Sequence, residues 1–436
     1  MMPPKRQLPP LTAMRFFLAL WVMVYHQTWP DGYLGGLLPR LPGALYGGLR
    51  TGYVAVGVFF VLSGFVLSYA HLLGRSPSAS LLPGFAVARF ARIYPVYCLG
   101  LLGVAPFVVR YSITHRSVAT VAKQTVLACL SWTLVQSWFP GAALSWNFPA
   151  WSLSDEAFFY LCFPFVGLLL WRLSGLRAIL IGCTALWAAA LAVPAVAVAF
   201  PLHGFGDAAA TSTLPNVAPL WPGFVKFNPL LRLPEFCVGI LLCRAYRELV
   251  SQDHYLVGRG YWLYTPGLFC EALAISNAGS LPYPLVHNGL LLPLHSAVIL
   301  GLALGGGVCT RFLSSPLLVF LGNASYSMYI VHVEVSQWMD AAARRVFGTK
   351  LVGAGWFLFY VGVVVFLASV IYRVLEQPSH RYWKAKLTPR LEAWVSKQNE
   401  MAQPGPHSRQ KSRLFLQLRW AKTIYSRNAR AGLRGV

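Results

Sequence analysis

Two polar residues in the first apolar stretch, Arg15 and His26, stand 11 positions apart. In a helix this spacing is about 20° past three full turns, so both side chains would share one face about 16 Å apart. A guanidinium can bind an anion, and an imidazole can take up a proton near neutral pH or relay an acyl group. The alternative, in which Arg15 reaches the headgroups and His26 lies at the interface, stays open on spacing alone.

A second pair of cations, Arg89 and Arg92, precedes Pro95 and a long apolar run. On a helix their i, i+3 spacing would point both guanidinium groups the same way. The planar guanidinium binds phosphate oxygens with two parallel hydrogen bonds, so the pair is a candidate phosphate clamp. On spacing alone, two positive anchors at a membrane surface are the favoured interpretation.

The segment from Trp151 to Glu156 opens another apolar run with two serines and two acids. Ser152 or Ser154 can cap a helix, and acids in the first turn are favoured by the helix dipole. Capping does not explain why Glu156 leads directly into the apolar run. The segment is therefore a further candidate for chemistry.

The elements that position these residues follow from the composition. The chain has 436 residues, of which 56% are hydrophobic and 11% are charged, and its mean hydropathy is +0.55. Soluble domains carry roughly a quarter charged residues, so a soluble α/β domain is excluded. The 15 Trp, 20 Tyr and 27 Phe exclude a disordered chain. We therefore predict an all-α, polytopic membrane helix bundle.

A bilayer core requires about 20 apolar residues per helix, which predicts ten spans. An eleventh stretch at 118–138 carries Lys123, Gln124 and Gln136, and we expect a partly buried or re-entrant helix there. With both chain ends in the cytoplasm, the positive residues between spans fall on the inner side. The predicted spans lie near 13–30, 52–73, 93–112, 154–172, 178–200, 229–246, 261–277, 288–307, 315–334 and 354–374.

The formal charge of +23 is concentrated at the C-terminal end. From Arg381 to Arg434 there are 13 Lys and Arg and two acids. We expect a membrane unit at 1–380 and a basic cytoplasmic tail at 381–436 that is attracted to anionic lipids. Residues 413–425 fit either an interfacial helix or an unstructured basic segment. Because the other cations lie between apolar runs, nucleic acid is not an expected partner. None of the eight cysteines forms a C-x-x-C pair, and no metal site is predicted.

Five of the 13 acids fall inside or beside predicted spans. An ionised group in hydrocarbon costs roughly 2.5–3.5 kcal/mol on insertion scales, so such groups face the bundle interior and pair or serve function. These acids are Asp155, Glu156, Glu235, Glu271 and Glu334.

Taken together, these motifs resemble acyltransferase family 3, the bacterial membrane O-acyltransferases of cell-envelope glycans. Arg15 and His26 match its R-x10-H pattern, and six further stretches match its motifs in the same order. Asp155 is a small departure from the pattern, in which that position is more often apolar or another acid, and it puts a second carboxylate beside Glu156. The six stretches are 60–65, 89–95, 151–156, 232–239, 325–332 and 376–378.

The resemblance implies a multi-pass protein of the inner (plasma) membrane that transfers an acyl group, most simply acetyl, from cytoplasmic acyl-CoA to a hydroxyl of an exported or lipid-linked polysaccharide. His26, Glu156 and Arg15 are the candidate catalytic residues, with Glu156 either orienting His26 or acting as the base. Arg89 and Arg92, together with Arg15, would bind the acyl-CoA. The candidates on the substrate side are Trp151, Ser152, Ser154, Tyr329 and His332, and the candidate structural polar residues are Arg232, Glu235 and Glu376.

Two alternatives remain open at this stage. The acceptor could be a small molecule, such as a macrolide, or a lipid intermediate. The chain could instead be a transporter in which Glu235 and Glu271 relay protons. The absence of an internal repeat and of paired broken helices argues against the transporter.

Overall fold

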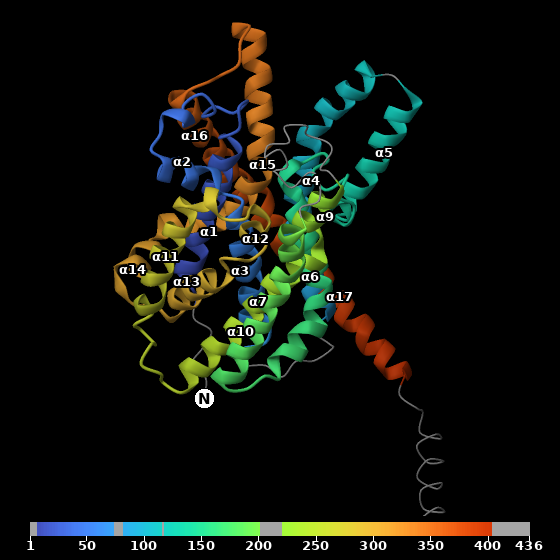
Figure 1. Cartoon of the computed structure of the whole chain (residues 1–436). Coiled ribbons are helices and arrows are strands. Elements are labelled where there is room, and N and C mark those ends of the chain that lie inside the picture. Colours follow the sequence, from blue (N-terminus) through green and yellow to red (C-terminus); the bar gives the residue numbers. More distant parts are fainter. Residues whose placement is uncertain (1–6, 74–81, 116, 201–219, 403–436) are drawn as a thin grey trace, which may run out of the picture.

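The computed structural model describes residues 7–73, 82–115, 117–200 and 220–402, and within these ranges it contains helices and connections but no strand (Figure 1). The all-α prediction is confirmed for this part of the chain, and each of the ten predicted spans overlaps one helix. These helices are α1 (Pro9–His26), α3 (Val54–His71), α4 (Leu82–Thr114), α6 (Trp151–Trp171), α7 (Leu176–Ala199), α10 (Pro229–Ser251), α11 (Tyr261–Ser276), α13 (Leu292–Leu304), α15 (Pro316–Phe347) and α16 (Ala354–Ile371).

Seven helical segments of the described chain are long and apolar enough to cross a membrane, which supports a membrane protein. Three of the ten helices, α1, α10 and α11, are not among them. The polar side chains of Arg15 and His26 lower the hydropathy of α1, and those of Arg232 and Glu235 lower that of α10. Helix α11 is too short, with 16 residues. The count of ten spans therefore stays a prediction. The seven segments are Val54–His71, Phe85–Thr114, Phe148–Trp171, Leu176–Ala199, Tyr283–Leu304, Pro316–Phe347 and Ala354–Leu387.

Helix α4 begins earlier than the predicted span at 93–112. It runs for 33 residues through Pro95 and Pro106 without a break. Arg89 and Arg92 therefore lie on the helix itself, and both side chains line one cavity. Each proline removes one backbone hydrogen bond of the helix. Membrane helices tolerate this loss because neighbouring helices and side chains can satisfy the freed carbonyl group.

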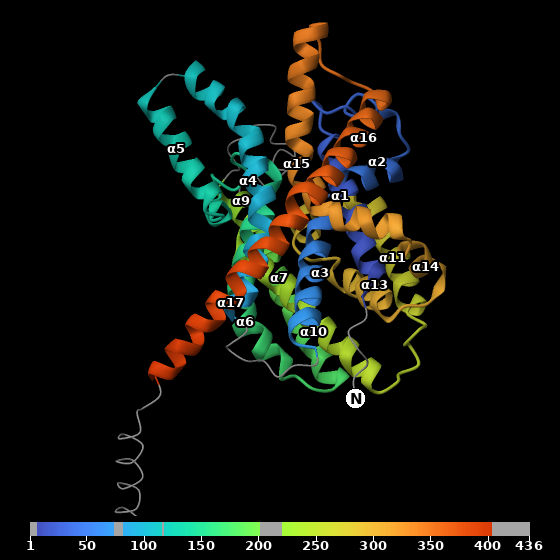
Figure 2. The same ribbon diagram turned by 180° about the vertical axis from the view of Figure 1, so that it is seen from behind.

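The stretch predicted as a re-entrant helix forms α5 (Val118–Trp132), which has 15 residues and turns back beside α4 (Figure 2). Its first half is largely exposed, and its last turn is anchored by the buried residues Leu127 and Ser131. The tyrosine hydroxyl of Tyr97 on α4 donates to the carbonyl oxygen of Ser131 at 2.6 Å. The segment after α5 is thereby brought against α6.

At the centre of the bundle, α3 and α10 pack closely together. Two glycines, which have no side chain, let the two helix backbones touch there. A Cβ on Gly64 would lie 2.0 Å from the carbonyl oxygen of Phe236, and one on Gly239 would lie 2.0 Å from that of Val61. Small residues at such crossings let helix backbones approach closely in membranes. Helix α1 packs against both α3 and α15, so its polar face is directed into the bundle.

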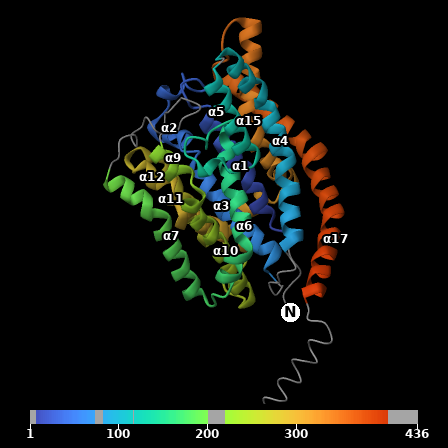
Figure 3. The same cartoon turned by 90° about the vertical axis from the view of Figure 1, so that its right-hand side faces the viewer.

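The basic tail begins as a continuation of the bundle. A π-helical turn, Tyr372–Glu376, joins α16 to α17 (Gln377–Ala402), which lies along α4 (Figure 3). Helix α17 passes without a break through residue 380, where the two units were divided. The possible interfacial helix at 413–425 lies outside the described residues. The described chain starts and ends toward the same end of the molecule, although its orientation in a membrane stays a prediction (Figures 1 and 3).

Candidate active site

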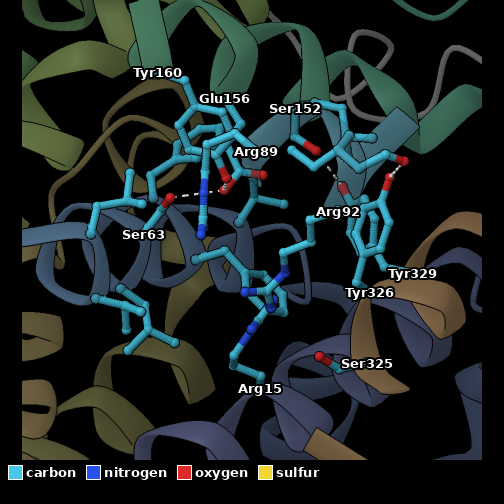
Figure 4. Close-up of a pocket in the computed structure, with 18 residues that line it drawn as sticks. Arg15, Ser63, Arg89, Arg92, Ser152, Glu156, Tyr160, Ser325, Tyr326 and Tyr329 are labelled. Carbon is cyan, nitrogen blue, oxygen red and sulfur yellow. Dashed lines mark hydrogen bonds between the residues drawn. The ribbon is translucent and has the colours of Figure 1, made fainter. Parts of the chain in front are cut away.

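Three arginines from two helices converge on one cavity, which we call the arginine cavity (Figure 4). Arg15 comes from α1, and Arg89 and Arg92 come from α4. Glu156, on the second turn of α6, faces them. The rest of the polar lining is Ser63, Ser152, Tyr160, Ser325, Tyr326 and Tyr329, and the apolar lining includes Val56, Phe59 and Phe60.

Glu156 is held within the arginine cavity by two hydroxyl groups. The hydroxyl of Ser63 on α3 donates to its Oε1 at 2.8 Å, and the phenol of Tyr160 donates to the same oxygen. Arg89 lies over the ring of Tyr160, with its guanidinium carbon 6.0 Å from the ring centre. The Nε of Arg89 is buried without a hydrogen-bond partner, so this cation retains donor capacity for an anion.

A second carboxylate, that of Glu376, lies near the three arginines. It ends the π-helical turn and accepts a hydrogen bond from the hydroxyl of Ser327 at 2.7 Å. Its carboxyl group also interacts electrostatically with Arg92 and Arg15. π-helical turns inside helices occur often at functional sites. Glu376 thus balances part of the arginine charge and fixes the helix that follows.

His26 lies in a second cavity, the histidine cavity. Val56 and Tyr329 line both cavities and therefore form the wall between them. Aromatic and histidine rings make up most of the rest of the lining, and Lys226 is the one lysine or arginine among the described lining residues. The other lining residues include Tyr25, Trp29, Tyr53, Phe148, Trp151, Phe227, Tyr283 and His287.

The ring of His26 is held by a second histidine. Its Nδ1 lies 2.8 Å from Nε2 of His332 on α15, and the two rings are nearly parallel at 7°. Trp29 and Phe148 contact the His26 ring edge to face, with ring centres 5.5 Å and 5.2 Å away. The ring therefore has one defined orientation.

The backbone carbonyl of Tyr329 determines where the protons of this histidine pair lie. The carbonyl oxygen only accepts, so His332 donates to it through Nδ1, 2.7 Å away. In a neutral His332 ring the Nε2 then accepts, and Nδ1 of His26 donates to it. The Nε2 of His26 keeps its lone pair and is the basic nitrogen of the pair.

The sequence interpretation offered Glu156 as the group that orients His26. The structure places Glu156 in the arginine cavity and His26 in the histidine cavity, and His332 occupies the position of the orienting group. His332 was expected on the substrate side, and the structure places its buried ring outside the lining of both cavities, stacked on His26.

A hydrogen bond joins Tyr329, which lines both cavities, to Ser152, which lines the arginine cavity. The hydroxyl groups of Tyr329 and Ser152 are 2.8 Å apart, and each lies within 3.1 Å of the carbonyl oxygen of Pro149. Ser154, two residues further along the same motif and so on the opposite side of α6, lines neither cavity. Its hydroxyl donates to the carbonyl oxygen of Leu134 at 2.7 Å and accepts from Ser137 at 2.7 Å, so it anchors the segment before α6.

Two of the three residues predicted to be structural, Arg232 and Glu235, form a buried network behind the histidine cavity, whereas Glu376 lies near the cavity arginines. Arg232 is fully buried and pairs with Glu235 at 3.0 Å. Its Nη1 donates to the backbone oxygen of His287 and to Oδ1 of Asn288, the latter at 3.0 Å. A buried cation is tolerated when it is paired, and the Glu235 carboxylate pairs with Arg232. The network holds His287 against the cavity.

The acids in the spans divide into paired and unpaired groups. Glu235 pairs with Arg232, and Glu271 lies 3.2 Å from Nε2 of His295. Within the described chain, the carboxyl oxygens of Asp155 and Glu334 are buried without a hydrogen-bond partner. The two acids named for a proton relay are therefore accounted for by packing partners.

Lys226 and His287 were missed by the sequence interpretation. Lys226 lies on α9 (Leu220–Phe227), with its ammonium 5.2 Å from the centre of the Phe227 ring and 5.1 Å from that of Tyr283. Burial lowers the pKa of the Lys226 amino group. A lysine just before an apolar run looks like an interfacial anchor, and no local pattern distinguishes it from a cavity residue.

Comparisons with known proteins identify similar acyltransferases. A family profile described as an acyltransferase domain, family 3, matches residues 10–373. Acyltransferase MdmB of Streptomyces mycarofaciens is 29% identical over 414 residues, which cover 87% of this chain and 94% of that protein. A putative O-acetyltransferase of Staphylococcus aureus strain MRSA252, SAR0937, is 20% identical over 88% of this chain and 60% of its own length. No solved structure matches.

Proposed function

The chain belongs to acyltransferase family 3, and on that premise we propose that it is an integral membrane O-acyltransferase that moves an acyl group, most simply acetyl, from acyl-CoA to a hydroxyl of an exported or lipid-linked polysaccharide. One observation supports the proposal. The arginine cavity and the histidine cavity share Tyr329 and Val56, so a donor bound in the first and an acceptor bound in the second would meet at these two residues.

The arginine cavity is the donor side of this proposal. Coenzyme A carries a pyrophosphate and a 3′-phosphate, and guanidinium groups bind such oxygens with paired, charge-assisted hydrogen bonds. Arg89 and Arg92 would bind phosphate, and Arg15 would lie beside the pantetheine arm or the thioester. The negative charges of Glu156 and Glu376 offset part of the electrostatic repulsion among these three cations.

The histidine pair supplies the proton chemistry. The Nε2 of His26 takes the proton of the acceptor hydroxyl as its oxygen attacks the thioester carbon. The tetrahedral intermediate then collapses, the carbon–sulfur bond breaks, and the proton on His26 passes to the departing sulfur. The positive charge on His26 in between is stabilised through Nδ1 by His332, whose own proton is held by the Tyr329 carbonyl.

The histidine cavity is the acceptor side. Its wall of rings offers apolar faces, and Tyr25, Tyr53 and Tyr283 add hydroxyl groups that can bind sugar oxygens. A large aromatic wall with a few polar groups is typical of small-molecule and sugar sites. A small-molecule or lipid acceptor would use the same wall, and the relative from Streptomyces, named only as an acyltransferase, is compatible with either acceptor.

Two measurements test the function. Purified protein given acetyl-CoA and an envelope glycan fraction should release free coenzyme A, which a transporter would not do. NMR of envelope polysaccharide from wild-type and deletion strains should show O-acyl signals that the deletion removes. Unchanged O-acyl signals together with coenzyme A release would move the acceptor to a small molecule or lipid. If no coenzyme A is released, the proposed acyltransferase activity is overturned.

A further inference from the structure

The first turns of α17 present a basic face beside the arginine cavity. His380, Arg381 and Lys384 lie within about 100° of one another around the helix, and the three side chains are exposed or partly exposed. Lys386 projects from the other side of the helix, where its ammonium donates to the hydroxyl of Tyr382 at 2.7 Å. The basic residues of α17 therefore divide into two faces.

The first of these faces is directed toward the cavity arginines. Helix α17 packs along α4, the helix that carries Arg89 and Arg92 (Figure 3). The His380 ring interacts electrostatically with Arg89, Arg92 and Lys384. Tyr372, in the π-helical turn before α17, interacts with both Arg92 and Arg381. The positive charge of the cavity thus continues onto the surface of α17.

Such a row of cations is costly unless an anion accompanies it. Like charges repel, and the acids near this row, Glu156 and Glu376, are already bound to hydroxyl groups inside the bundle. Arg15, Arg89 and Arg92 already exceed these two acids before the α17 residues are added. A ligand with several negative charges, extending from the cavity to the surface, matches this arrangement.

The position of the row fits the outer part of coenzyme A. Arg89 is seven residues from the start of α4, so it lies about 10 Å inside that end of the helix. A thioester arm inside the arginine cavity would leave the phosphate-bearing nucleotide at this end, where α17 passes. The nucleotide is the polyanionic part of the donor.

We propose that Arg381 and Lys384, on the face of α17 directed toward Arg89 and Arg92, bind the phosphates of the nucleotide portion of acyl-CoA. This inference rests on the proposed function for the identity of the donor. It adds a donor subsite outside the bundle and assigns a role to the beginning of the basic tail. An anionic lipid headgroup, which shares the phosphate chemistry, is the competing occupant.

The test measures binding of two donors to the full-length protein in nanodiscs of neutral lipid. Acetyl-CoA and acetyl-pantetheine carry the same thioester, but only acetyl-CoA has the nucleotide. The double variant Arg381→Gln/Lys384→Gln should weaken acetyl-CoA binding about tenfold, as expected for losing charge-assisted bonds to phosphate. Acetyl-pantetheine binding should not change. The salt dependence of acetyl-CoA binding should also become shallower.

Lys386→Gln is the matched control, because it removes the same charge from the other face of the same helix. It should leave acetyl-CoA binding at the wild-type value. The inference is overturned if the double variant binds acetyl-CoA as tightly as wild type, or if it loses both donors equally. It is also overturned if the variant alters only the binding of phosphatidylglycerol added to the nanodisc lipid. Failure of the wild type to bind acetyl-CoA would instead overturn the proposed donor.

Discussion

The Nδ1 atom of His26 lies 2.8 Å from Nε2 of His332, although 306 residues separate them in the chain. The contact joins the first helix of the bundle to α15, and the carbonyl of Tyr329 lies behind it at 2.7 Å. This order of donors leaves one basic nitrogen, Nε2 of His26. In the proposed mechanism a neutral imidazole takes the orienting position that a carboxylate has in many histidine-based sites.

His332→Ala should lower the rate of acyl transfer by about 100-fold, near the lower end of what a positioned base contributes. The reason is that His26 loses the acceptor that fixes its tautomer. His332→Gln should recover part of this loss, because its side-chain oxygen can accept from Nδ1 of His26. The measurement is kcat with saturating acetyl-CoA, and wild-type kcat in His332→Ala would contradict the orienting role.

Glu156→Gln should act on donor binding and not on the proton step. The change removes a negative charge from the arginine cavity and keeps an oxygen for Ser63 and Tyr160. We expect the KM for acetyl-CoA to shift several-fold and the pH dependence of kcat to stay that of the wild type. A lost or displaced pH profile would show that Glu156 takes part in proton transfer.

Gly64→Ala should destabilise the bundle by about 1–3 kcal/mol, the usual cost of overpacking. Its Cβ would lie 2.0 Å from the carbonyl oxygen of Phe236, so α3 and α10 would have to separate. Gly362→Ala is the control, since a Cβ there meets nothing within 4 Å. Thermal unfolding in detergent should separate the two variants, and equal midpoints would contradict the close helix contact.

Arg232→Met should cost about 3–5 kcal/mol of stability, because it leaves Glu235 buried without its cation. The double variant Arg232→Met/Glu235→Met should recover much of that stability, since a buried ion pair can be replaced by apolar packing of similar volume. Unfolding midpoints of the two variants provide the comparison. A double variant no more stable than the single would show that Arg232 acts mainly through His287 and Asn288.

Helix positions and the convergence of the cavity arginines could be predicted from the sequence, since apolar runs and ordered motifs carry both. The 11-residue spacing of Arg15 and His26 also fits the structure, where each lines one of two adjoining cavities. The partner of His26 could not be predicted, because the contact with His332 depends on how α1 packs on α15. The apolar periodicity of the sequence does not indicate which helices pack against one another. For the same reason the position of Lys226 in the lining of the histidine cavity could not be predicted.

The most direct test of the account is transfer of radiolabelled acetyl from acetyl-CoA to an envelope glycan fraction by purified wild-type protein and His26→Ala. The wild type should label the glycan and release coenzyme A. The variant should bind acetyl-CoA as the wild type does and transfer at least about 100-fold more slowly, because it has lost the base. Transfer by His26→Ala at the wild-type rate would contradict the central role of the histidine pair.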